Sequence, residues 1–227
     1  MKRYHFKNNA RILIVFILFV FVNLTVFGTA QVADKIIYNG QEYMLFSNPM
    51  ESFFAQYPEK RPEGGIITTA SWRGYVATFE IKDNQLYLKD IEIDVYIKDE
   101  KVNDKYSSKS VLNEIFPNQE HIKIDWLTGI LVIPHGELVN YVHMGYASTY
   151  ENYILLEIDK GDLKNEKQFN SNDYEKFKER QFQAFKKTED YKKIRDNLRK
   201  EGGGSRKFID TFLKIYVIEY TSKILVE

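Results

Sequence analysis

Three short stretches of this chain share the pattern I-x-x-[N/G]-x-L, in which Asn or Gly stands between an apolar strand end and an apolar strand start. They lie at residues 81–86, 133–138 and 158–163. A tight turn between antiparallel strands needs a residue at that place that tolerates a left-handed backbone. The copies are unevenly spaced, whereas a solenoid or propeller repeats at a regular period. The pattern therefore predicts three hairpins of one turn type in a meandering antiparallel sheet.

Further strand-like segments extend this predicted sheet. Asn39-Gly40 joins 35–38 to 41–46, and Asn-Gly is the strongest short-range hairpin signal because both residues accept positive φ. A phase slip near Asp90 indicates a β-bulge or a change of face. The other segments rich in apolar and β-branched residues are 66–71, 72–82, 86–97, 122–126, 129–133, 138–144 and 153–158.

Two short helices are expected among the strands. Asn48 is placed to cap a helix over 49–57, with Pro49 at its first position and Glu51 three residues after the cap. Ser108 is expected to cap a second helix over 108–116, which Pro117 ends.

The last third of the chain is predicted to be mainly helical. One helix is expected from Ser171 or Asn172 to about 187. A fresh cap at Thr188 then either begins a second helix or marks a kink in a single one, and the glycines at 202–204 end the helical segment. Residues 206–226 combine an apolar spacing of four with a strand-like run at 215–218, so both helix and strand remain open there.

These segments predict an α+β fold, with an antiparallel meandering β-sheet, short helices and a C-terminal helical segment packed on the sheet. The β-rich domain is expected over 31–165 and the helical segment over 166–227, within one globular unit. Phe177, Phe182 and Phe185 are expected to dock the helices on the sheet. The chain has 227 residues and is 44% apolar, which suffices for a sizeable core.

The N-terminus has the layout of an export signal. Residues 1–11 carry four basic side chains and no acid, 12–27 are mostly apolar, and Gly28-Thr29-Ala30 offers a small-residue exit. This predicts a signal peptide, 1–30, cleaved before Gln31. The alternative is a membrane anchor formed by 12–28, although a spanning helix usually needs about 20 apolar residues. The expected location is therefore exported, periplasmic or extracellular, or else anchored in a membrane.

Charge is unevenly distributed along the chain. Overall it is balanced, with 32 basic and 32 acidic residues, but 173–207 hold 12 Lys/Arg against 7 Asp/Glu. A solvated helix whose opposite charges partly pair explains this bias more simply than an anionic partner. Nucleic-acid binding is not expected, because the rest of the chain is acidic and no recognition module is present.

The motif search narrows the possible chemistry. The chain has no cysteine, which excludes disulfides, thiol catalysis and Cys-ligated metals. It also lacks G-x-S-x-G, H-E-x-x-H and the two glycine-rich phosphate motifs. The run at 202–207 superficially resembles a phosphate loop, but it follows a helix and its spacing is wrong. No cofactor and no metal are therefore expected.

The best candidate for chemistry is His135, Glu137 and His143, with His121 as a further imidazole. Two imidazoles and a carboxylate can hold zinc or act as acid and base. If 138–144 is a strand, Glu137 and His143 share one of its faces, with His135 in the preceding turn. The simpler alternative is a solvated turn histidine and a sheet histidine with a hydrogen-bond partner.

Aromatic residues form the second candidate site. Trp72, Arg73, Tyr146 and Tyr150 are the predicted binding residues, and the small-residue loop 144–150 is where a ligand is most expected. The alternative is that these rings fill the sheet core. We therefore expect a non-enzymatic, exported, bacterial-type binding module of the cell envelope, with a protein or glycan partner and membrane contact only through 12–28. A small exported hydrolase or lyase using His135, Glu137 and His143 is the alternative.

Overall fold

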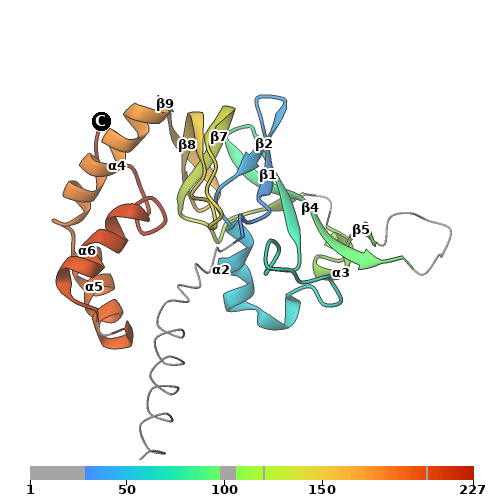
Figure 1. Cartoon of the computed structure of the whole chain (residues 1–227). Helices are drawn as coiled ribbons and strands as arrows, with labels where there is room; N and C mark the ends of the chain where they lie inside the picture. The colour runs from blue at the N-terminus through green and yellow to red at the C-terminus, as the bar shows by residue number, and fades with distance from the viewer. Residues whose placement is uncertain (1–28, 98–105, 120, 203) are drawn as a thin grey trace, which may run out of the picture.

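The computed structural model describes residues 29–227 except 98–105, 120 and 203. A nine-stranded, mostly antiparallel sheet lies between two short helices on one side and a layer of three helices on the other, as Figure 1 shows. The predicted α+β fold is confirmed. The strands are β1 (Asp34–Tyr38), β2 (Gln41–Leu45), β3 (Val76–Lys82), β4 (Gln85–Tyr96), β5 (Tyr106–Ser110), β6 (Ile122–Lys123), β7 (Gly129–Asn140), β8 (Thr149–Asp159) and β9 (Asp162–Asn170). The helices are α2 (Pro49–Gln56), η1 (Pro58–Lys60), α3 (Leu112–Ile115), α4 (Ser171–Phe185), α5 (Glu189–Gly202) and α6 (Arg206–Ile215).

The strands follow the order β2-β1-β3-β4-β9-β8-β7, and β5 and β6 pair with β4 off this path. β1 and β3 run parallel, and every other pairing among the named strands is antiparallel. The two ends of the open sheet approach each other just after β2, where the Phe46 N–H donates to the Val132 carbonyl at 2.8 Å. This approach brings the start of α2 close to β7.

Two of the three predicted turns are hairpins. Asp83 and Asn84 take φ of 51° and 58° between β3 and β4, and Lys160 and Gly161 take 48° and 79° between β8 and β9. The third prediction is wrong, since residues 133–138 lie inside the continuous strand β7. Gly136 has φ of 80° at an irregularity in the β7–β8 register. The sequence pattern marks a left-handed residue, and a bulge uses one as readily as a turn does.

Several local predictions need correction. Residues 66–71 form a loop, and the strand predicted over 122–126 shrinks to two residues. Ser108 caps no helix, because it lies in β5, and α3 begins after Val111. β9 was not expected, since most of its residues are polar and its side chains stay largely exposed or half-buried. The bulge expected near Asp90 is confirmed by the register shift opposite Thr78 and Phe79.

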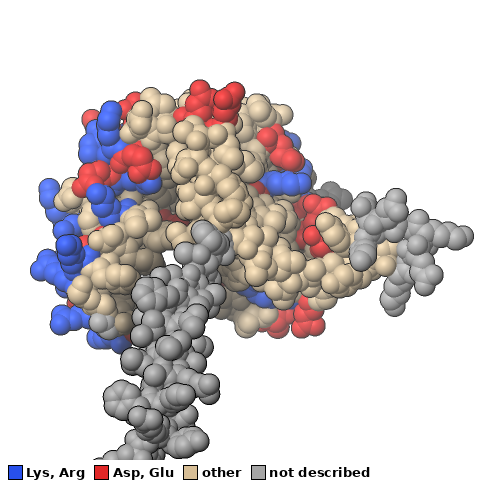
Figure 2. All heavy atoms as spheres, in the orientation of Figure 1, with Lys and Arg blue, Asp and Glu red and all other residues tan. Residues whose placement is uncertain are grey.

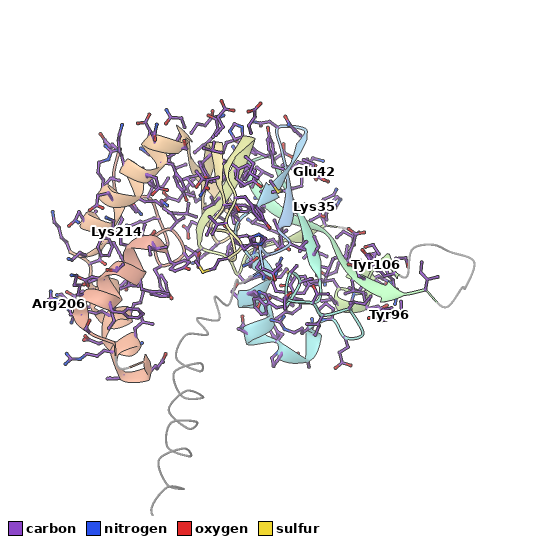
Figure 3. All side chains as sticks on the ribbon, viewed as in Figure 1. Lys35, Glu42, Tyr96, Tyr106, Arg206 and Lys214 are labelled. Carbon is purple, nitrogen blue, oxygen red and sulfur yellow. The ribbon has the colours of Figure 1, made fainter. Side chains whose placement is uncertain are left out.

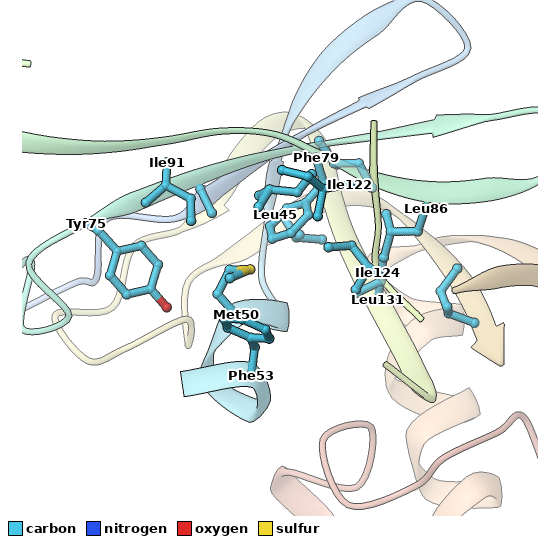
Figure 4. Close-up of a cluster of buried hydrophobic side chains, with 14 of the residues drawn as sticks. Leu45, Met50, Phe53, Tyr75, Phe79, Leu86, Ile91, Ile122, Ile124 and Leu131 are labelled. Carbon is cyan, nitrogen blue, oxygen red and sulfur yellow. The ribbon is translucent and has the colours of Figure 1, made fainter. Parts of the chain in front are cut away.

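Alternation along β7 and β8 divides the core into two clusters. Leu131, Ile133, Ile154 and Leu156 point toward α2 and α3, whereas Ile130, Val132, Tyr153 and Leu155 point toward the C-terminal helices. In Figure 4, Met50 and Phe53 of α2 lie beneath Leu45, Tyr75 and Ile91 of the first cluster. The sheet is therefore covered by apolar packing on both faces.

The helical layer docks through the side chains that the sequence predicted. Phe177, Phe182 and Phe185 are all buried, in one cluster with residues of β7 and β8. Thr188 does begin a new helix, since its Oγ1 accepts from the Tyr191 N–H at 3.2 Å. Asn170, just before the predicted caps, is the residue that caps α4. Of the open segment 206–226, the first part is helix α6 and residues 216–220 form turns, so no strand forms there.

The predictions about export and anchoring fall mainly on residues outside the described part of the chain. Thr29 and Ala30 are its first described residues, and 1–28 are not described. Among the described residues, no helix is both long and apolar enough to cross a membrane. The expectation of a signal peptide or an anchor over 12–28 stays a prediction.

Candidate functional site

A cleft of about 810 Å³ opens between the sheet and the C-terminal layer. One wall is formed by β7 and the loop 144–149, and the other by α4 and the turns after α6. Its size falls in the range of small-ligand sites, roughly 300–1,000 Å³. Its aromatic and ionisable lining residues are Phe46, Tyr146, Tyr153, Tyr174, Glu175, Lys178, Tyr216, Glu219 and Tyr220.

The loop 144–149 is held in place by Tyr146. Its ring stacks on Phe46, with 4.7 Å between centroids and 12° between planes, and its hydroxyl donates to Asn48 Oδ1 at 2.8 Å. Asn48 was expected to cap α2, but its side chain makes no capping bond and serves the loop instead. Burial raises the pKa of Tyr146 to about 12. One face of the Tyr146 ring therefore packs against Phe46, and Tyr146 also lines the cleft.

Tyr150, which follows this loop, contacts Phe46 and Tyr153. Its ring meets Phe46 edge-on at 5.7 Å, and its N–H donates to the Tyr153 hydroxyl at 2.9 Å. Tyr150 is half-buried and does not line the cleft. Of the two predicted loop tyrosines, Tyr146 therefore faces the cleft and Tyr150 positions the loop.

The wall on α4 combines aromatic stacking with one ion pair. Tyr174 stacks on Tyr153 with 4.2 Å between ring centroids. Lys178 lies 4.9 Å above the Tyr174 ring and pairs with Glu175 at 2.7 Å. Among the described residues that line the cleft, Lys178 is the one cation, and it is already paired.

Glu219 is the second carboxylate of the cleft. Burial among the cleft walls raises its pKa, although its side chain still reaches solvent. Its charge also acts on the hydroxyls of Tyr146, Tyr174 and Tyr220, and this places it among the cleft's tyrosines. Within the described residues, no hydrogen-bond donor or cation pairs with the Glu219 carboxylate.

The first described residues lie at the rim of the same cleft. Ala30 bridges to Gly145 in parallel, and the Gln31 N–H donates to the Gly145 carbonyl at 3.1 Å. The Gln31 amide also donates to the Thr69 carbonyl at 2.8 Å. The residues flanking the predicted cleavage point are therefore tied to the loop 144–149.

Arg73, predicted to bind a ligand, is instead enclosed in the fold. Its Nη1 donates to Asp34 Oδ2 at 2.7 Å and its Nη2 to the Val32 carbonyl at 3.0 Å. Asp34 Oδ1 accepts from the Ala77 N–H, and both charged side chains are almost fully buried. Burial disfavours the charged guanidinium, but the attraction of Asp34 outweighs it and raises the pKa of Arg73. Trp72, by contrast, is 53% exposed on its loop.

Glu51 extends this buried junction. It accepts from the Tyr75 hydroxyl at 2.6 Å and from Arg61 Nη2 at 2.8 Å. Burial would raise the pKa of Glu51, but these two hydrogen bonds lower it overall. Glu51 therefore joins α2 to the segment between η1 and β3.

The residues of the predicted histidine constellation lie in different local settings. His135 lies in the strand, with its ring edge-on to Tyr43 at 6.0 Å, and not in a turn. β7 ends at Asn140, so His143 lies in the following loop, 4.6 Å from the Tyr141 ring. Glu137 is exposed, and His121 lies near Tyr87. The shared strand face expected for Glu137 and His143 is therefore wrong. Across 29–227, leaving out the undescribed positions, no three or more His, Cys, Asp or Glu side chains are placed to hold a metal ion.

The charge bias of 173–207 appears on the surface of the helical layer, at the left of Figure 2. Figure 3 places Arg206 and Lys214 on this layer and Tyr96 and Tyr106 on the projecting β4–β5 arm at the opposite end. Several of the layer's cations have acidic partners: Lys176 with Asp173, Lys192 with Glu189, Lys186 with Asp210, and Lys214 with Glu179. The pairing agrees with a solvated helical surface.

Comparison with family models, curated proteins and solved structures finds no match for the chain. The site is therefore defined by its own geometry. Sequence reasoning identified the loop 144–150 but missed Phe46, Asn48 and Glu219. The contacts of Phe46 and Asn48 join residues about a hundred positions apart, and no local pattern encodes them. A carboxylate within the otherwise apolar and aromatic run 216–220 was the one available signal for Glu219.

Proposed function

We propose that the chain is an exported, non-enzymatic binding module of the cell envelope, and that the cleft beside the loop 144–149 is its binding site. The observation that carries the proposal is the meeting of this loop with Glu219 and the tyrosines of the helical layer in one cleft of about 810 Å³. Aromatic rings with a few polar groups are typical of ligand sites, and rings of this kind suit sugar or peptide ligands.

The cleft offers recognition chemistry in a fixed frame. Tyr146 and Tyr174 are each braced by a stacked neighbour, so their positions are set before a ligand arrives. A pre-organised site loses less conformational freedom on binding. This supports a binding module over the hydrolase or lyase alternative, for which His135, Glu137 and His143 would have to act together.

Soluble muropeptides are a suitable first probe, because they combine sugar rings with a peptide stem and belong to the envelope. Hydrogen–deuterium exchange with and without the probe should show protection at 144–149 and at 216–222. Protection confined to the β4–β5 arm or to the loop carrying Trp72 would contradict the proposed site. Cleavage of the muropeptide by the protein would instead support the hydrolase or lyase alternative.

Export is the second part of the proposal, and the small-residue exit at 28–30 supports it. Intact-mass analysis of the protein from the cells that make it should give a chain that begins at Gln31. The new ammonium of Gln31 could still donate to the Gly145 carbonyl. Recovery of the full-length chain from the membrane fraction alone would refute cleavage and favour an anchor over 12–28.

A further inference from the structure

Among the residues that the structure describes, one carboxylate of the cleft has no matching cation. Glu175 is paired with Lys178, whereas Glu219 has no donor or cation among the described residues. Its side chain is nevertheless exposed at the cleft, so a ligand can reach it. A partly desolvated carboxylate gains more than a fully hydrated one when a cation approaches, because the local dielectric constant is lower.

The rings around Glu219 favour the same type of ligand. Tyrosine faces attract cations through their quadrupole, most strongly where water is excluded. The cleft already shows this interaction, since Lys178 lies 4.9 Å above the Tyr174 ring. Tyr146, Tyr216 and Tyr220 also line the cleft. The Glu219 carboxylate and the tyrosine rings therefore both attract a positively charged ligand.

The cleft is much larger than a single ammonium group. Ile130, Val132, Ile215 and Ile218 contribute apolar surface to its lining. Ile215 and Met144 are 58% and 55% exposed, so this surface continues to the outside. A ligand that fills it carries a cation on a larger body with apolar faces.

We propose that the cleft recognises a primary or quaternary ammonium group, with Glu219 and the surrounding tyrosines as the cation-binding residues. This inference rests on the proposed function, which places the ligand in this cleft. The inference adds that the ligand group recognised by the cleft is positively charged. A basic side chain of a peptide and the free amine of a cell-wall peptide stem share this chemistry.

The test compares choline with 3,3-dimethylbutan-1-ol, its neutral isostere of the same shape. Binding to the full-length protein is followed by amide chemical shifts of 144–149 and 216–222. Choline should give saturable shifts at both segments, and the neutral isostere should bind at least about tenfold more weakly. Glu219→Gln should weaken choline binding by about tenfold, whereas Glu63→Gln, at an exposed carboxylate outside the cleft, should leave it unchanged.

The outcomes separate this inference from the proposed function. Equal binding of both compounds in the cleft, unaffected by Glu219→Gln, would overturn the ammonium preference and leave the binding site standing. Shifts confined to residues outside the cleft would overturn both. The absence of a saturable shift with choline at any residue would also overturn the ammonium preference. In that case the muropeptide experiment alone would test the binding site.

Discussion

The buried junction around Arg73 and the cleft around Glu219 both contain carboxylates beside tyrosines, yet they differ in how their charges are satisfied. Asp34 accepts from Arg73 and from a backbone N–H, and the pair is sealed from solvent. Glu219 has no such partner within the part of the chain that the structure describes, and it is exposed to the cleft. A fully paired buried charge serves the fold, whereas an unpaired charge in an open cleft is available to a ligand. Substitutions at the two places should therefore differ in their effect on stability.

The largest effect is expected at the junction. Arg73→Met leaves Asp34 buried without its cation and should lower the free energy of unfolding by about 3–5 kcal/mol. Urea denaturation measures it. Trp72→Ala is the matched control, because its exposed ring should contribute within about 0.5 kcal/mol. A small effect of Arg73→Met would mean that the junction is dispensable and that Arg73 is free for another role.

The second-largest loss of stability is expected where the helical layer packs on the sheet. Phe182 is buried in the cluster that α4 shares with β7, β8 and α5, and its truncation leaves a cavity. Phe182→Ala should cost about 2–5 kcal/mol and lower the melting temperature clearly. Phe208→Ala, at a 66% exposed position on α6, should change little. Equal melting temperatures for Phe182→Ala and the parent protein would show that the helices do not depend on this packing.

A smaller, pH-dependent effect is expected from Tyr146. Its pKa in the folded protein is raised to about 12, above the ordinary value of 10.0. A raised pKa gives stability that is present below about pH 10 and lost as the pH rises toward 12. The parent protein should therefore lose up to about 2 kcal/mol more than Tyr146→Phe over this range. Identical pH profiles in urea denaturation would argue that Tyr146 is not buried in the cleft wall.

The smallest effect on stability belongs to Glu219. Its raised pKa means that the folded state disfavours the ionised form, so its contribution to stability falls as the pH rises through the ordinary value of 4.5. Glu219→Gln should therefore match or slightly exceed the parent in stability at neutral pH. A marked loss of stability would reveal a structural partner for Glu219 and weaken its assignment as a ligand-binding group.

Sequence patterns predicted the elements whose signals are local. The Asn39-Gly40 hairpin, the helix after Asn48 and the new helix at Thr188 all depend on a few neighbouring residues. The same reasoning failed at Gly136, where a left-handed residue forms a bulge inside β7. β9 escaped prediction because its pairing with β8 stabilises a mostly polar segment. Tertiary pairing decides such segments, and local propensity does not reveal it.

The site was predictable only in part for the same reason. Small residues beside Tyr146 indicated a loop, but nothing local showed that Phe46 and Asn48 would brace it. Arg73 was predicted to bind a ligand from its place beside Trp72, whereas its partner Asp34 lies 39 positions earlier in the chain. Ion pairs between distant segments are decided by the fold as a whole.

The central claim is that the aromatic cleft, and not the histidines, carries the function. Its most direct test is muropeptide binding to three variants whose folds are checked by circular dichroism. Tyr146→Ala should weaken binding by about thirtyfold, as expected for a buried interface tyrosine worth at least about 2 kcal/mol, with a weaker loss for Tyr150→Ala. His135→Ala combined with His143→Ala should leave binding unchanged. Unchanged binding in Tyr146→Ala, together with loss of binding or of activity in the folded double histidine variant, would contradict the account and favour the enzyme.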